Sequence, residues 1–165
     1  MIILGIDPGL ARLGFGVIKK FKDKIEVLDY GCIETLPGVC DGERLKIINN
    51  ELNKLIKKHQ PEVMAVEKLF FFKNLKTVMP VSQAKGVILL TAAKKNIPVY
   101  EFTPLQVKMA VTGYGKAEKK QVQKMIQTLL NLEEKPKDKN KRKDDATDAL
   151  GIAFCYTLQS KTKLS

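Results

Sequence analysis

The order in which short apolar runs and longer amphipathic segments follow one another constrains the fold of this chain most strongly. Residues 1–6 (MIILGI) form an apolar run that ends at an Asp-Pro-Gly turn beginning at Asp7, a pattern typical of a buried strand. Two more strand patterns follow at 13–19 and 25–33, separated by a polar stretch short enough for a hairpin. We therefore expect three sequential strands, with neighbours antiparallel, at the start of the fold.

Helical and strand patterns alternate in the remainder of the chain. Apolar side chains at three- and four-residue intervals predict a helix over 41–59, closed by Pro61. The further expected elements, in chain order, are a strand at 63–66, a helix at 75–95 that Pro80 should start or kink, a strand at 98–102, and helices at 104–111, 117–130 and 144–158. This order indicates an α/β fold, a mixed sheet covered by helices.

Length and composition indicate one folded domain spanning residues 1–165. The chain has 165 residues, 44% of them hydrophobic, and shows no internal repeat or linker. Residues 133–143 (EEKPKDKNKRK) contain no apolar side chain except the proline ring, so we expect a mobile basic loop there. The last residues, 159–165, are expected to be a disordered tail.

A large excess of positive charge points to the kind of partner. The chain has 29 Lys and Arg residues against 18 Asp and Glu residues, a formal net charge of +11. Such a surplus favours a polyanion, because Lys and Arg side chains that meet phosphates release condensed counterions. A merely lysine-rich composition is the alternative explanation, since only Arg12, Arg44 and Arg142 are arginines.

Cysteine and histidine usage bears on zinc and on the compartment. Cys32, Cys40 and Cys155 show no CxxC spacing, so neither structural zinc nor a disulfide framework is expected. The single histidine, His59, is expected to face solvent at the end of its helix, which also argues against zinc. No apolar run approaches the about 20 residues that span a bilayer, and no signal peptide pattern opens the chain. We expect a reduced, cytoplasmic location.

Acidic residues stand at the ends of several expected elements. Asp7 and Glu67 each directly follow an expected buried strand, and Asp145 and Asp148 share one face at the start of the last helix. Asp144, four residues before Asp148, is an alternative to Asp145 that periodicity does not exclude. If these elements are adjacent, the carboxylates converge and repel one another unless cations are bound. Carboxylates without His or Cys select Mg²⁺ or Mn²⁺.

Each of these acidic residues also has a simpler explanation. Asp7 before Pro-Gly can be a turn residue, Glu67 an ordinary loop carboxylate, and Asp144 with Asp145 a helix N-cap with first-turn charge. The coincidence of two strand ends with one helix face favours a shared site instead. Two divalent ions about 3.5–4 Å apart can activate a water and stabilise the leaving oxygen of a phosphodiester. A basic chain with such a cluster therefore suggests phosphodiester hydrolysis.

Seven short stretches, taken together and in this order, are characteristic of one family. They are Ile6-Asp7-Pro8-Gly9, Gly14-Phe15-Gly16-Val17, Val66-Glu67, Gln83-Ala84-Lys85-Gly86-Val87, Gln106-Val107-Lys108, Gly115-Lys116-Ala117-Glu118-Lys119 and Asp145-Ala146-Thr147-Asp148-Ala149-Leu150. The set resembles the RuvC Holliday junction resolvases, from Met1 to about Tyr156. The first stretch alone is shared across the wider ribonuclease-H-like superfamily, so the specificity lies in the combination.

The resemblance implies a fold, an activity and a set of metal ligands. The fold would be ribonuclease-H-like, a five-stranded mixed sheet flanked by helices. A homodimer would place two active sites on opposite arms of a four-way DNA junction and make paired, symmetric cuts that a ligase can seal. The family's acidic positions fall on Asp7, Glu67, Asp145 and Asp148, as catalytic residues and ligands of two Mg²⁺ ions that Mn²⁺ can replace. The RuvA–RuvB branch-migration complex is the implied protein partner.

The resemblance also implies residues that contact DNA. By position, Phe70 would stack at the opened crossover, although Phe70, Phe71 and Phe72 stand in a row and the others can serve the core or an interface. Lys108 and Lys119 match basic positions near the scissile phosphate. Further phosphate contacts are expected from lysines around the start of one helix, namely Lys116, Lys120 and Lys124. A solvated lysine-rich face is the alternative for all of them.

Three other functions fit part of the pattern. A ribonuclease-H-like nuclease acting on structured RNA would use the same chemistry in a different groove. A non-catalytic junction-binding module would share the charge but would not cut. An actin-like phosphotransferase also carries Asp-x-Gly, but 165 residues leave no room for its second nucleotide-binding half.

Overall fold

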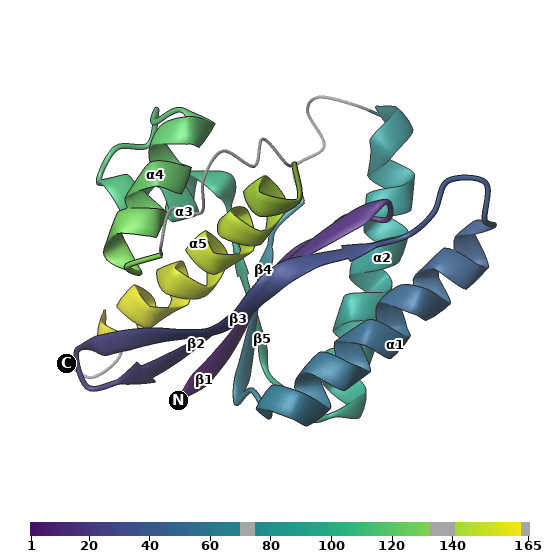
Figure 1. The fold of residues 1–165 in the computed structure, drawn as a ribbon, viewed down its shortest axis with the longest axis horizontal. Coiled ribbons are helices and arrows are strands. Elements are labelled where there is room, and N and C mark those ends of the chain that lie inside the picture. The colour runs from purple at the N-terminus through teal and green to yellow at the C-terminus, as the bar shows by residue number, and fades with distance from the viewer. Residues whose placement is uncertain (70–74, 133–140, 163–165) are drawn as a thin grey trace.

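A five-stranded mixed sheet with helices on both faces forms the fold in the computed structural model, which describes residues 1–69, 75–132 and 141–162 (Figure 1). The strands are β1 (Ile2–Asp7), β2 (Arg12–Phe21), β3 (Lys24–Glu34), β4 (Val63–Glu67) and β5 (Val99–Phe102). The helices are α1 (Asp41–His59), α2 (Leu75–Lys94), α3 (Pro104–Thr112), α4 (Lys119–Leu129) and α5 (Lys141–Thr162).

The strand order, β3-β2-β1-β4-β5, brings the ends of two predicted strands together. β1 pairs antiparallel with β2, and β2 with β3, whereas β1, β4 and β5 are parallel. Ile6 is paired with Val66, so Asp7 and Glu67, the final residues of β1 and β4, lie at the same edge of the sheet. Ligand sites of α/β sheets form at this edge, beyond the carboxyl ends of parallel strands.

Two hydrophobic layers hold the helices on the sheet. Helices α1 and α2 cover one face, while α5 lies across the other, with α3 and α4 packed against it (Figure 1). Side chains of a strand alternate between faces, and accordingly Leu4 and Ile6 of β1 belong to the α1–α2 layer while Ile3 belongs to the α5 layer. Alternate residues of β1 and of β4 therefore face opposite helix layers, so a residue's position along the strand determines which helices its side chain contacts.

Glycines allow α5 to lie directly on β1 and β2. A Cβ atom at Gly16 would come 2.7 Å from Cδ2 of Leu150, and one at Gly5 would come 2.8 Å from Cβ of Ala153. At Gly14, a Cβ would overlap the backbone carbonyl group of Asp145 in the first turns of the helix. The missing side chains set the short distance between α5 and the sheet.

The expected elements are confirmed, with differences at their ends. Helix α1 has the predicted bounds 41–59. Helix α4 begins at Lys119 rather than 117, because Glu118 and Gln121 form a reciprocal capping box at its start. Pro80 lies inside α2 and does not start it. Helix α5 is longer than predicted at both ends, so 141–143 are not part of a loop and 159–162 are not part of a tail.

The prediction for His59 is wrong, and several other predictions concern residues outside the described part of the chain. His59 was expected to face solvent, but its side chain is only 9% exposed, with Nε2 at 2.9 Å from Oδ2 of Asp29 on β3. That prediction was wrong because the partner on β3 lies 30 residues away in the sequence. The predictions on Phe70–Phe72 and on residues 133–140 and 163–165 lie outside the described residues. None of the described helices is both long and apolar enough to span a bilayer.

Candidate active site

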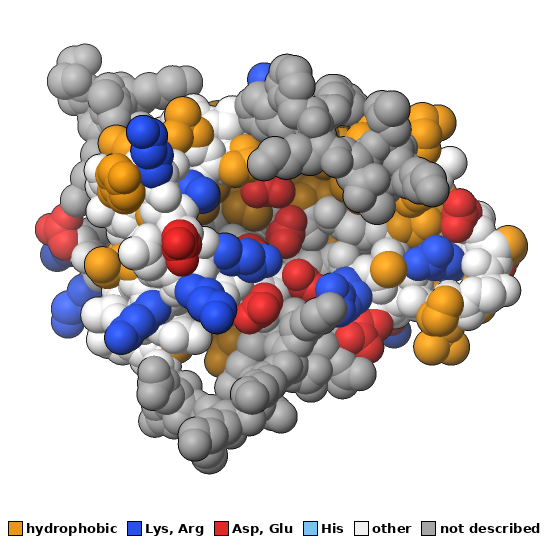
Figure 2. Space-filling view, turned by 90° about the horizontal axis from the view of Figure 1, so that it is seen from above, with side chains coloured by type: hydrophobic (Ala, Val, Ile, Leu, Met, Phe, Trp, Pro, Cys, Tyr) orange, Lys and Arg blue, Asp and Glu red, His pale blue; other side chains and the backbone are white. Residues whose placement is uncertain are grey.

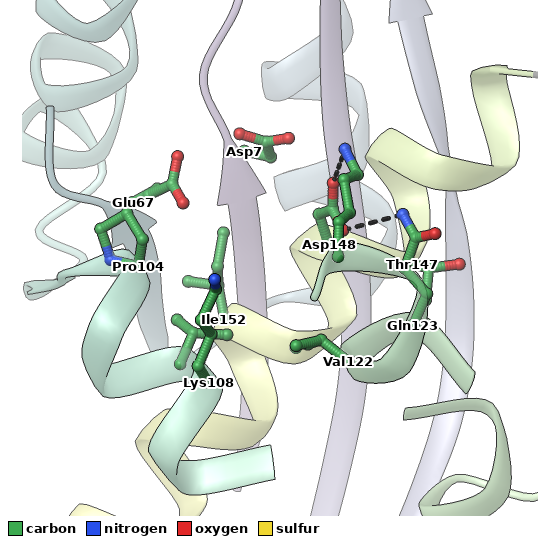
Figure 3. A pocket seen from close by; sticks show the side chains of 12 residues that line it. Asp7, Glu67, Pro104, Lys108, Val122, Gln123, Thr147, Asp148 and Ile152 are labelled. Carbon is green, nitrogen blue, oxygen red and sulfur yellow. Dashed lines mark hydrogen bonds and ion pairs between the residues drawn. The ribbon is translucent and has the colours of Figure 1, made fainter. Parts of the chain in front are cut away.

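The alternation of side chains along β1 and β4 places the carboxylates of Asp7 and Glu67 on the side of the sheet that α5 covers. Ile3 of β1 and Ala65 of β4 belong to the layer beneath α5, so Asp7 and Glu67, four and two residues further on, face the same side. Figure 3 shows both side chains turned toward one cavity from the ends of neighbouring strands. The predicted meeting of these two strand ends is confirmed.

The first turns of α5 supply two more carboxylates. The register pairs Asp7 with Gly14, and the backbone of Asp145 lies directly over Gly14, so the start of α5 is held beside Asp7. One carboxylate oxygen each of Asp7, Asp145 and Asp148 lies within 4.8 Å of the others. Asp144, by contrast, is exposed. The geometry therefore brings Asp145 rather than Asp144 to Asp7.

A cavity of about 250 Å³ opens beside this cluster, and Glu67 borders it with Asp7 and Asp148 (Figure 3). Lys108 of α3 and Lys119 of α4 also line it. Seen from above, acidic side chains occupy a hollow in the surface, with Lys and Arg side chains to either side (Figure 2). An anionic ligand that enters this cavity would therefore meet Lys108 and Lys119 beside the carboxylates.

Polar side chains fix the carboxylates of α5. Nζ of Lys119 lies 2.6 Å from Oδ2 of Asp148, and Nε2 of Gln123 donates a hydrogen bond to Oδ1 of the same residue at 3.1 Å. Nε of Arg12 lies 2.9 Å from Oδ2 of Asp145. That oxygen is buried and, despite this contact, receives no hydrogen bond of acceptable geometry within the described structure.

Burial and mutual repulsion disturb the protonation of the cluster. Burial, followed by the charges of Glu67, Asp148 and Asp145, raises the pKa of Asp7 well above its ordinary value. Burial and the charge of Asp148 raise the pKa of Glu67, and burial also raises that of Asp145 in spite of Arg12. The cluster is thus short of positive charge in the protein alone.

A divalent cation fits this environment. The available donors are carboxylate oxygens, which Mg²⁺ and Mn²⁺ prefer, and no His or Cys takes part in the described cluster. Oδ2 of Asp145 is a buried acceptor without a hydrogen-bond donor in the described structure, and burial together with three neighbouring carboxylates raises the pKa of Asp7. Both features are what removal of a bound cation from an oxygen-ligand site would produce.

The raised pKa of Asp7 predicts how stability depends on pH without metal. Because the folded protein holds this proton more tightly than the unfolded chain, the stabilisation is complete below the ordinary Asp value of 3.8 and is lost as pH rises through the raised pKa. In EDTA, the melting temperature of Asp7→Asn should therefore exceed that of the wild type by a margin that widens with pH. Thermal melts between about pH 4 and pH 8 measure this margin; a constant margin would contradict it.

The predicted DNA-contacting lysines are not all in one place. Lys108 and Lys119 line the cavity, whereas Lys116 and Lys120 are exposed near the start of α4. Two residues at the site were not predicted, Arg12 and Gln123. Gln123 lies four residues after Lys119, on the same face of α4, a spacing that could have found it. No local pattern links Arg12 to Asp145.

Fold and site together define the class of protein, a ribonuclease-H-like fold with acidic residues at the ends of the neighbouring parallel strands β1 and β4 and on the helix across them. The structure is similar to that of T. thermophilus RuvC in complex with a Holliday junction substrate, at 32% identity and a TM-score of 0.88, covering 99% of this chain and 96% of that one.

Comparison of sequences identifies the family. The family model described as crossover junction endodeoxyribonuclease RuvC matches residues 3–156. The RuvC of Alkaliphilus metalliredigens is 53% identical over 156 residues, which cover 94% of this chain and 92% of the relative. That of Fusobacterium nucleatum is 49% identical over 165 residues, 100% of this chain and 84% of the relative. The chain belongs to the RuvC family of crossover junction endodeoxyribonucleases.

Proposed function

We propose that this chain is a structure-selective endonuclease that resolves Holliday junctions in recombination and DNA repair by paired, symmetric, metal-dependent cuts. The observation that carries the proposal is the convergence of Asp7, Asp145 and Asp148, from opposite ends of the chain, beside a lysine-flanked cavity. Membership of the RuvC family and the likeness to RuvC bound to a junction support the choice of substrate.

Four carboxylates would hold two Mg²⁺ ions, which Mn²⁺ could replace. Asp7, Asp145 and Asp148 supply oxygens to one small volume, and Glu67 supplies another from the edge of the same cavity. Bound divalent ions would activate a water and stabilise the leaving oxygen of the phosphodiester.

The protein's own cations orient the phosphate. Lys108 projects into the cavity from α3, and Lys119 lies at its rim while paired with Asp148. With Asp148 as a metal ligand, the ammonium group of Lys119, now 2.6 Å from Oδ2 of Asp148, would be available to the strand. A lysine there stabilises charge that builds on the phosphate during attack. Lys116 and Lys120 would extend the basic surface along α4, and Phe70 is proposed to stack on a base at the crossover.

A substrate panel tests the proposed activity. The wild type is incubated with a synthetic mobile four-way junction, the matching linear duplex and an RNA hairpin, each in Mg²⁺ and in EDTA. We expect two symmetric, ligatable nicks in the junction in Mg²⁺ alone, with little cutting of the duplex. Preferential cleavage of the hairpin would assign the chain to structured RNA, and junction binding without any cleavage would make it a non-catalytic module.

A second copy of the chain is proposed to dock on α2. Its outer face carries an apolar stripe with Met79 67% and Leu90 54% exposed, and it continues through exposed Ala93. Gly86 lies within this stripe with nothing within 4 Å of its ideal Cβ position, which leaves room for another backbone to approach. A homodimer that buries this face would present two carboxylate clusters to one junction, as paired cutting requires.

The dimer proposal predicts the effect of one substitution. Leu90→Glu should convert a dimer into a monomer, because each copy would bury a carboxylate in the proposed apolar interface. Phe21→Glu is the matched control, since Phe21 is 65% exposed on β2 and outside the stripe. Sedimentation equilibrium measures both. A wild type that is monomeric at micromolar concentration, or an unchanged dimer in Leu90→Glu, would contradict the proposed interface.

A protein partner and a cellular location are also proposed. The RuvA–RuvB branch-migration complex is the proposed protein partner, on the strength of the family resemblance alone. A cytoplasmic location is proposed because Cys32, Cys40 and Cys155 are all free thiols.

A further inference from the structure

A second hollow, which the proposed reaction does not use, opens on the other side of Asp7. It has a volume of about 650 Å³ and contains Asp7 and Asp145 at one end. Its walls are the loop that follows β1, the segment after β3 and one turn of α2, contributing among others Gly9, Leu36 and Pro80. Because Asp7 lines both hollows, the second hollow lies directly beside the proposed metal ligands.

Arg12 is the half-exposed cation of this hollow. It stands at the start of β2 with its side chain 41% exposed, and its Nε lies 2.9 Å from Oδ2 of Asp145. The contact is a charge pair without good hydrogen-bond geometry, because Oδ2 is buried and accepts no hydrogen bond in the described structure. The guanidinium group in this position compensates the charge of Asp145, but its N–H donors form no well-aligned hydrogen bond with Oδ2 of Asp145.

Arg44, the other arginine that lines this hollow, already binds Thr35 and Asp41. Its side chain is 16% exposed, its Nε donates to Oγ1 of Thr35 at 2.8 Å, and its Nη1 lies 3.5 Å from Asp41. Thr35 in turn donates to the backbone oxygen of Leu10 at 2.6 Å. These bonds tie Arg44 to the loop between Asp7 and Arg12, so Arg44 is less able than Arg12 to take a new partner.

The charges of the hollow make phosphate binding conditional on metal. Asp7, Asp145 and Glu34 line it together with the two arginines, so the hollow does not attract an anion in the protein alone. A divalent ion on Asp7 and Asp145 would reverse the local charge and repel the guanidinium group of Arg12 from Asp145. Arginine stays protonated throughout, and its planar donors match two phosphate oxygens.

We propose that Arg12 is a metal-released phosphate ligand, which neutralises Asp145 in the absence of a divalent ion and binds a backbone phosphate in the second hollow once the ion is bound. This inference rests on the proposed function, because the phosphate belongs to the junction strand that is cut. It adds a DNA contact in the second hollow, among whose lining residues Lys108 and Lys119 do not appear.

Junction affinity measured with and without a divalent ion tests the proposal. The probe is a four-way junction, titrated in Ca²⁺ or in EDTA at several salt concentrations. We expect Arg12→Gln to weaken binding about tenfold in Ca²⁺, as loss of one charge-assisted hydrogen-bonded contact does, and to lower the salt slope by about 0.9. In EDTA its affinity should stay within about twofold of the wild type, because Arg12 is then paired with Asp145.

A control variant and a second measurement complete the test. Lys54→Gln removes the same charge from exposed α1, where Lys54 pairs with Glu51, and should behave alike in Ca²⁺ and EDTA. Without DNA, Arg12→Gln should bind Mn²⁺ several-fold more tightly, since a competing cation is gone. Equal losses of junction affinity in both buffers, no loss in Ca²⁺, or weaker Mn²⁺ binding would each overturn the proposal. A wild type that binds no junction would overturn the proposed function instead.

Discussion

Asp7→Asn is expected to reduce junction cleavage at least about 100-fold while leaving junction affinity within about threefold. Asp7 is one of the three clustered carboxylates and lines both hollows, so its amide would remove a negative ligand from the centre of the site. A loss of about 3 kcal/mol of transition-state stabilisation corresponds to this fall in rate. Binding persists because it depends on lysines and arginines. Single-turnover cleavage and an equilibrium titration with the same junction measure the two effects.

Asp144→Asn is the matched control for Asp7→Asn. Asp144 is exposed in the first turn of α5, next to Asp145 but outside the group of oxygens that lie within 4.8 Å. Its replacement should leave cleavage within about twofold of the wild type. If Asp144→Asn lost activity as Asp7→Asn does, then Asp144 rather than Asp145 would complete the site, and the geometry described above would be wrong.

Gly14→Ala is expected to disable the site without touching a carboxylate. A Cβ at Gly14 would overlap the carbonyl oxygen of Asp145 and lie 2.5 Å from its carbonyl carbon, so α5 must move away from β2. Overpacking of this kind costs about 1–3 kcal/mol, or a fall of roughly 2–12 °C in melting temperature. Because Asp145 and Asp148 move with the helix, cleavage should fall about 100-fold, as displacements near 1 Å do elsewhere.

Gly42→Ala separates this effect from a general intolerance of alanine. Gly42 lies in the first turn of α1, and nothing stands within 4 Å of its ideal Cβ position. Alanine there should raise stability by about 0.5–1 kcal/mol with no change in cleavage. Thermal melts and Mn²⁺ titrations on both variants measure the difference. A Gly14→Ala protein with normal metal affinity and rate would show that the glycine does not set the position of α5 over Asp7.

Local patterns in the sequence predicted most elements and the carboxylates. The spacing of Leu45, Ile48 and Leu52 determined the bounds of α1, because its buried face repeats every three to four residues. Asp7 and Glu67 could be predicted from their places at the ends of apolar runs. Asp145 and Asp148 followed from their shared helix face, while the choice against Asp144 needed the family resemblance and the structure.

Long-range contacts lay beyond these patterns. Arg12 meets Asp145 across 133 residues of chain, and Asp29 meets His59 across 30, so no periodicity connects either pair. In the sequence, Gly14 appeared only as part of a motif. The need for glycine there follows from the backbone of Asp145, which lies directly over it in the structure. Helix α5 was predicted too short at both ends. The residues at its ends are mostly polar, so the spacing of apolar residues does not reveal that they are helical.

Anomalous scattering from Mn²⁺ in crystals of the wild-type protein would show where divalent ions bind. We expect Mn²⁺ bound by oxygens of Asp7, Asp145 and Asp148, with Glu67 at the edge of the same cavity, and loss of that density in Asp7→Asn. Mn²⁺ found only elsewhere on the surface, with the Asp7 cluster empty at saturating concentration, would contradict it.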